Sequence, residues 1–144
     1  MRKRSTTLSR TSRLGRSKKP KAKLVREADA LWSQLVKDRA KGICELCGKP
    51  GSDAHHMNSR RSHFTRWDAR NGVFLCKGCH LRFHSRESYS CWEWFEKTRP
   101  EDWRWVVENL HTVAEKSTLE TALRNLKAWK DKDDPFYWDG EVGI

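Results

Sequence analysis

The sequence predicts an α+β protein with a small core that a structural zinc site helps to hold together. Three observations predict this class. Apolar residues recur at helical spacing toward both ends, two short strand-like runs flank a long central loop, and four cysteines form two C-x2-C pairs around those runs. Only 36% of the 144 residues are hydrophobic and 34% are charged, so the core must be small and metal reinforcement is expected.

The net charge of +11 is concentrated in two parts of the chain. Residues 1–23 carry ten Lys or Arg and no acidic residue, and residues 41–86 carry nine basic against three acidic side chains. Residues 1–22 also lack apolar periodicity, so we expect a disordered basic tail there. This distribution favours a polyanionic partner whose phosphates displace counterions, although a merely solubilising tail is the alternative.

The first elements follow from their apolar pattern. A helix is predicted from Leu24, and it should end near Lys41 and Gly42, where glycine can adopt the left-handed turn. Residues 54–57 and 72–75 are predicted to form two strands. The loop of about fourteen residues between them is long for a hairpin, which indicates a function.

The C-terminal third is predicted to be helical and mainly structural. A short aromatic helix is expected over residues 91–97, and the next helix should begin at Pro100, since proline suits the first helical position. Ser117 and Glu120 form a capping box for the last helix. From Asp131 onward the chain is expected to be an irregular tail.

The four paired cysteines predict a structural zinc site. Cys44 and Cys47 form one C-x2-C pair, and Cys76 and Cys79 form the other. A turn brings the two sulfurs of such a pair together, and four thiolates suit a tetrahedral, redox-inert ion. A redox pair or a mixed cysteine and histidine site are the alternatives.

The cysteine count and the hydropathy also bear on location. Five cysteines, with Cys91 left over as a half-buried free thiol, favour metal binding in a reducing compartment over disulfides. The longest apolar run, residues 73–76, is far too short to span a membrane, and no apolar segment follows the basic N-terminus. We therefore expect a cytoplasmic protein with no membrane partner.

A second group of potential ligands lies in the same stretch of sequence as the cysteine pairs. His55 and His56 are adjacent, Asn71 follows, and His80 and His84 are four residues apart on a predicted helix over residues 77–85. Each histidine taken singly reads as a surface or helix-face residue. Together, their number and order favour a metal site, and neutral imidazole is also the side chain best suited to accept a proton near pH 7.

At these residues the chain resembles the HNH nucleases, whose ββα-metal fold is a two-stranded hairpin and a helix around one divalent ion. The resemblance rests on Ala54-His55-His56-Met57, on Asp68-x2-Asn71-Gly72-Val73-Phe74-Leu75-Cys76, and on Cys79-His80-x3-His84. It covers roughly residues 24–90 and includes a cysteine knuckle like that of many family members. The loop also resembles phage HNH proteins and, more distantly, the NinG recombination proteins of lambdoid phages.

The resemblance implies a role for each of these residues. His56 would be the general base, His55, His80 and His84 would bind the catalytic cation, and Asn71 would fix the loop and orient His56. Adjacent strand residues normally face opposite sides, so the roles of His55 and His56 could be exchanged. The implied cofactors are a structural Zn2+ and one catalytic divalent cation (Mg2+, Mn2+, Ni2+ or Zn2+), with no small-molecule cofactor.

The predicted function is therefore that of a metal-dependent HNH endonuclease that hydrolyses DNA. Residues 23–90 would form the nuclease domain and residues 91–144 a helical extension. Four loop cations are predicted to clamp DNA phosphates, with a solvated loop face as the alternative: Arg60, Arg61, Arg66 and Arg70. Two other functions stay open, namely a zinc-ribbon nucleic-acid binder without catalysis and a NinG-like nuclease directed at branched recombination intermediates.

Overall fold

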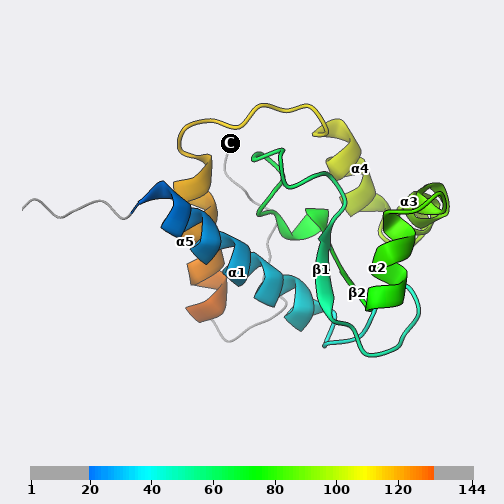
Figure 1. The fold of residues 1–144 in the computed structure, drawn as a ribbon. Coiled ribbons are helices and arrows are strands. Elements are labelled where there is room, and N and C mark those ends of the chain that lie inside the picture. The colour runs from blue at the N-terminus through cyan, green and yellow to red at the C-terminus, as the bar shows by residue number, and fades with distance from the viewer. Residues whose placement is uncertain (1–19, 132–144) are drawn as a thin grey trace, which may run out of the picture.

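The computed structural model describes residues 20–131 and has the predicted mixed α+β architecture (Figure 1). Within this range the elements follow in the order α1 (Lys21–Arg39), β1 (Asp53–His56), a 3-10 helix η1 (Ala69–Asn71), β2 (Gly72–Leu75), α2 (Lys77–Phe83), α3 (Ser88–Thr98), α4 (Pro100–Glu108) and α5 (Thr118–Asp131). The tail expected over residues 1–19 and the irregular tail after Asp131 lie outside the described residues.

Helix α1 begins three residues earlier than the apolar pattern predicts. Pro20 precedes its first residue, and Lys21 is already helical although it falls in the range predicted to be a tail. The helix ends at Arg39, and the chain then turns through two residues with positive φ, Lys41 at 53° and Gly42 at 73°. Glycine therefore supplies the left-handed turn, as predicted, but it shares that turn with a lysine.

Strands β1 and β2 form an antiparallel hairpin in which His55 pairs with Val73 and His56 pairs with Gly72. Strand β2 has the predicted bounds. Strand β1 is shifted by one residue toward the N-terminus, because it covers residues 53–56 and not 54–57. Every residue of β2 is buried, whereas β1 is only partly covered. The sheet is therefore most enclosed at β2, and the residues of β1 are half-buried.

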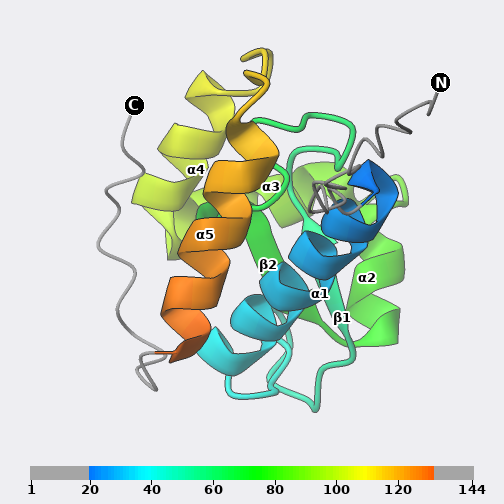
Figure 2. The same cartoon turned by 90° about the vertical axis from the view of Figure 1, so that its left-hand side faces the viewer.

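The hairpin lies between α1 on one side and α2 on the other (Figure 1). Strand β2 approaches α1 closely at Gly72, where a Cβ atom would overlap the side chains of Val36 and Trp32. Helix α5 runs beside α1 and buries Leu126 in the same hydrophobic cluster (Figure 2). The C-terminal helix thus shares a core with the first helix.

A second hydrophobic cluster lies on the α2 side of the sheet. It joins β2 and α2 to α3 and α4, with Phe95 and Val106 both at 0% exposure. Cys91 is 1% exposed in this cluster, so it is fully buried rather than half-buried, and it is a free thiol. None of the helices among the described residues is long and apolar enough to cross a membrane.

Candidate metal centres

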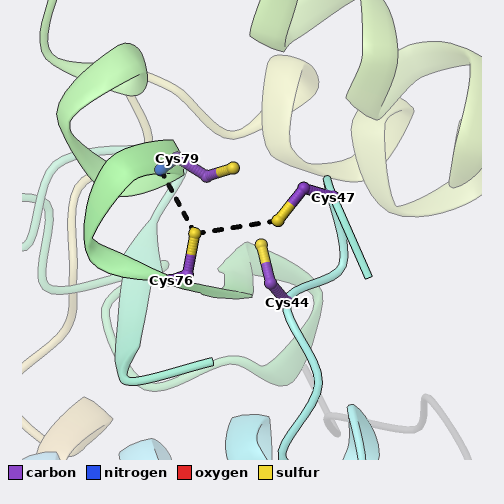
Figure 3. Close-up of side chains that lie close together, drawn as sticks. All are labelled: Cys44, Cys47, Cys76 and Cys79. Carbon is purple, nitrogen blue, oxygen red and sulfur yellow. Dashed lines mark hydrogen bonds between the residues drawn. The ribbon is translucent and has the colours of Figure 1, made fainter. Parts of the chain in front are cut away.

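The four paired cysteines meet at one point between the segment after α1 and the start of α2. Their sulfur atoms all lie within 4.8 Å of one another, and the Sγ atoms of Cys47 and Cys76 are 3.7 Å apart. All four side chains point into the same space (Figure 3). The two thiol pairs that the spacing predicted therefore form a single group of four.

Local backbone geometry brings the sulfurs together. The Cys44 amide donates to the Lys49 carbonyl at 2.7 Å, and Gly48 takes a positive φ of 75°, so the first pair lies on a tight turn. The second pair opens α2, where Cys76 precedes the first helical residue and its sulfur accepts from the Cys79 amide at 3.5 Å. Four soft donors in this arrangement could bind a structural metal such as zinc.

The thiols of this group differ in acidity. Burial raises the pKa of Cys44, but hydrogen bonds from the backbone of Cys76, Cys47 and Leu46 outweigh it and lower that pKa to about 7. Burial and the neighbouring thiols raise the pKa of Cys79. Four adjacent thiols resist simultaneous ionisation, and a bound cation removes this conflict by stabilising every thiolate.

Three histidines form a second group beside α2. His55 comes from β1, and His80 and His84 come from successive turns of α2 and its C-terminal end. Their nearest ring nitrogens lie within 4.8 Å of one another, and the Nε2 atoms of His80 and His84 are 3.1 Å apart. Two ring nitrogens this close must share a proton or a cation. The group could therefore hold a metal ion.

Asp53 orients one of these imidazoles. Its Oδ2 atom lies 3.2 Å from Nδ1 of His80, and this hydrogen bond is the main reason that the pKa of Asp53 is lowered. A carboxylate only accepts, so Nδ1 carries the proton and the Nε2 lone pair is directed at His84. Sequence reasoning did not single out Asp53. Its signal was present, because Asp53 and His55 are two residues apart on a strand and so share a face.

His56 lies on the other face of β1 and is not part of this group. Its ring stacks on the indole of Trp32 in α1, with centroids 3.8 Å apart and planes at 10°. Its Nε2 atom is 2.9 Å from the Arg66 carbonyl, which can only accept, so Nε2 carries the proton and Nδ1 keeps its lone pair. Burial lowers the pKa of His56 to about 4, and the ring is therefore neutral at pH 7.

Asn71 is fully buried and ties together the long loop between the strands. Its Oδ1 accepts from the Asn58 amide at 2.6 Å, and its Nδ2 donates to the carbonyls of Asn58 and Thr65 at 3.0 and 3.1 Å. Arg66, whose carbonyl holds His56, is the residue after Thr65. Asn71 therefore fixes the part of the loop that contacts His56, while its predicted catalytic importance stays a prediction.

The four loop arginines fall into two kinds. Arg60 and Arg61 are exposed. Arg66 donates to both carboxylate oxygens of Asp29 at 2.9 and 2.7 Å, and Arg70 donates likewise to Asp68 while its guanidinium lies 3.8 Å from the ring centroid of Trp105. Arg66 and Arg70 thus hold the loop to the body of the protein, which leaves Arg60 and Arg61 as the open cations of the four.

The remaining histidines stay outside both groups. His63 is exposed on the loop, 5.5 Å from the Trp67 ring, and His111 is exposed after α4.

No protein-family model matches the chain, and neither does any curated protein or solved structure. The resemblance to the HNH nucleases therefore rests on the residues and their geometry alone, and it stays a prediction.

Proposed function

We propose that this protein is a metal-dependent endonuclease of the HNH kind, which hydrolyses phosphodiester bonds in DNA. The observation that carries the proposal is the convergence of His55, His80 and His84, with ligand nitrogens within 4.8 Å of one another. Their order along a hairpin and a following helix agrees with the predicted ββα core. The carboxylate of Asp53 beside His80 adds the kind of partner that oriented metal-binding histidines usually have.

His56 would be the general base of this reaction. Its Nδ1 lone pair is free of the Arg66 carbonyl, and its neutral ring can accept a proton at pH 7. In the proposed step, Nδ1 takes a proton from water as the water oxygen bonds to phosphorus. The bond from phosphorus to the 3′ oxygen breaks, and that oxygen takes a proton from a solvent water, which leaves 5′-phosphate and 3′-hydroxyl ends.

The three imidazoles would hold the divalent cation. Such a cation neutralises the charge of the scissile phosphate and stabilises the departing oxygen. His55 is the most enclosed of the three: burial, and then the charges of His80 and His84, lower its pKa to about 3, so it is neutral and available as a ligand. His80 and His84 face outward enough for a phosphate to reach a shared cation.

Charge supports DNA as the partner. The chain carries +11, and Arg60 and Arg61 are exposed on the loop whose carbonyl at Arg66 contacts His56. Phosphates attract such cations and release counterions on binding. The two open arginines are therefore the loop residues that we expect to contact the DNA backbone.

A nucleic-acid binder without catalysis, held together by the cysteine-bound zinc, is the second candidate. One observation favours it: His56 faces α1 and stacks on Trp32, whereas His55 lies against His80 and His84 on the α2 side of the hairpin. In that case the chain would bind one thiolate-held ion and the histidine group would stay without a cation.

Plasmid nicking separates the two functions. Purified protein would be incubated with supercoiled DNA in EDTA and with added Mg2+, Mn2+, Co2+, Ni2+ or Zn2+, and metal content would be measured in parallel. The nuclease predicts nicking that EDTA abolishes and that His80→Ala removes, while the exposed His63→Ala control keeps it. DNA binding without nicking under any ion, together with one zinc per chain, would favour the binder.

A further inference from the structure

Glu45 connects the cysteine group to the edge of the hairpin. It lies between Cys44 and Cys47, its amide donates to the Phe74 carbonyl at 2.9 Å, and its Oε2 accepts from the Phe74 amide at 2.6 Å. Both polar backbone groups of Phe74 are thereby satisfied on the side of β2 that β1 does not cover. The turn that carries the thiols is thus fastened to β2 by one residue.

Two arginines from distant parts of the chain converge on the same carboxylate. Arg39 at the end of α1 lies 3.4 Å from Oε2, and Arg99 between α3 and α4 lies 3.3 Å from Oε1. Both also donate to the Gly72 carbonyl, at 2.6 and 2.8 Å. Burial and then the charge of Arg99 lower the pKa of Arg39, whereas the charge of Glu45 raises it. Glu45 is therefore the carboxylate that the two cations share.

The carbonyls held by these arginines surround Asn71. Arg39 donates to the Ala69 carbonyl at 2.6 Å, and Arg99 donates to the Arg70 carbonyl at 3.4 Å, in addition to their shared contact at Gly72. The three held residues are the two before Asn71 and the one after it. The backbone on both sides of Asn71 is thus held by two cations that contact Glu45, and Arg99 is held by Asp102 as well.

We propose that Glu45 is a positioning residue that couples the cysteine group to the loop holding His56. The connection runs from Glu45 through the two arginines to Asn71, whose side chain binds Asn58 and Thr65, and from there to the Arg66 carbonyl that orients His56. A metal held by the thiols would thereby help to order the loop that holds His56 as well as the turn that carries the cysteines. The effect on catalysis rests on the proposed nuclease function, whereas the effect on loop order does not.

Glu45→Gln and Glu45→Ala test the proposal in the full-length, zinc-loaded protein. Glu87→Gln is the matched control, because it removes another Glu–Arg pair, that with Arg82, where the Glu87 side chain is 60% exposed. Three readouts are needed: thiolate-held zinc, amide hydrogen exchange at Asn58 with Leu126 in α5 as a reference, and metal-dependent nicking.

We expect Glu45→Gln to keep its zinc, to exchange the Asn58 amide roughly tenfold faster with Leu126 unchanged, and to nick DNA roughly tenfold more slowly. Glu45→Ala should show larger effects, and Glu87→Gln none. Unchanged exchange at Asn58 in both variants would overturn the proposal, as would equal acceleration at Leu126, which marks general destabilisation. If the wild-type protein does not nick DNA, the proposed function fails while the exchange measurements still decide the role of Glu45.

Discussion

The indole ring of Trp32 and the imidazole of His56 lie nearly parallel, with centroids 3.8 Å apart. Trp32 also donates from Nε1 to the Asp68 carbonyl at 2.9 Å, so the indole is itself fixed in place. Between this ring and the Arg66 carbonyl, His56 has one defined orientation and one free nitrogen. Helix α1 therefore takes part in the candidate site, although none of its residues was expected there.

His56→Ala tests the general base. We expect nicking to fall by about 100- to 10,000-fold, the range usual for loss of a general base, because the substitution removes the proposed proton acceptor. The stacking on Trp32 contributes about 0.5–1.5 kcal/mol beyond the burial of the ring, so the variant should still fold and bind DNA. Nicking rate, circular dichroism and DNA affinity would be compared with His63→Ala. Equal nicking by both variants would remove His56 from the mechanism.

Cys44→Ser tests whether the cysteine group is part of folding. Binding of a structural zinc contributes on the order of 10 kcal/mol, comparable with the whole stability of a small domain, so its loss should leave the chain unfolded or aggregated. Cys91→Ser is the control, since Cys91 is also buried but lies outside the group. We expect it to cost about 1–3 kcal/mol and to retain zinc. A folded, zinc-free Cys44→Ser protein would contradict a structural role.

Asp53→Asn tests the orientation of His80. The amide introduced at position 53 could donate its NH2 group to Nδ1 of His80, so Nδ1 would no longer have to carry the proton. We therefore expect the histidine group to bind a cation about 10- to 100-fold more weakly. Thiolate-held zinc should not change. Cation affinity would be measured by competition with a chelator, with Asp38→Asn as the control because Asp38 bonds Gln34 on α1 instead. Equal affinity in both variants would show that Asp53 does not support a metal ligand.

The loop arginines should separate into two classes on substitution. Replacing Arg60 and Arg61 with Gln should lower the slope of log affinity against log salt by roughly 0.9 for each DNA phosphate that is no longer neutralised, with stability unchanged. Arg66→Gln should instead reduce the free energy of unfolding by about 1–2 kcal/mol, because it breaks two hydrogen bonds to Asp29. Urea unfolding and salt-dependent DNA binding would be measured for both. A large drop in stability of the Arg60 and Arg61 variant would reverse this assignment.

Local sequence patterns were sufficient where the physics is local. The bounds of β2 and the start of α4 at Pro100 follow from apolar runs and from the backbone preferences of proline. The grouping of Cys44, Cys47, Cys76 and Cys79 followed from spacing, because each pair is brought together by a single turn. The limits of α1 and β1 were shifted by one to three residues, since element ends depend on neighbours that a local pattern does not contain.

By itself, the sequence determined the mixed architecture and the four-thiol group, because apolar periodicity and the turn within each cysteine pair are properties of consecutive residues. It left the roles of His55 and His56 exchangeable. Only the tertiary structure decided that His56 turns toward Trp32, that Asp53 orients His80, and that Arg66 is bound to Asp29. Each of these contacts joins residues from separate parts of the chain. Their partners are set by how helices pack on the hairpin, and that packing depends on the whole chain.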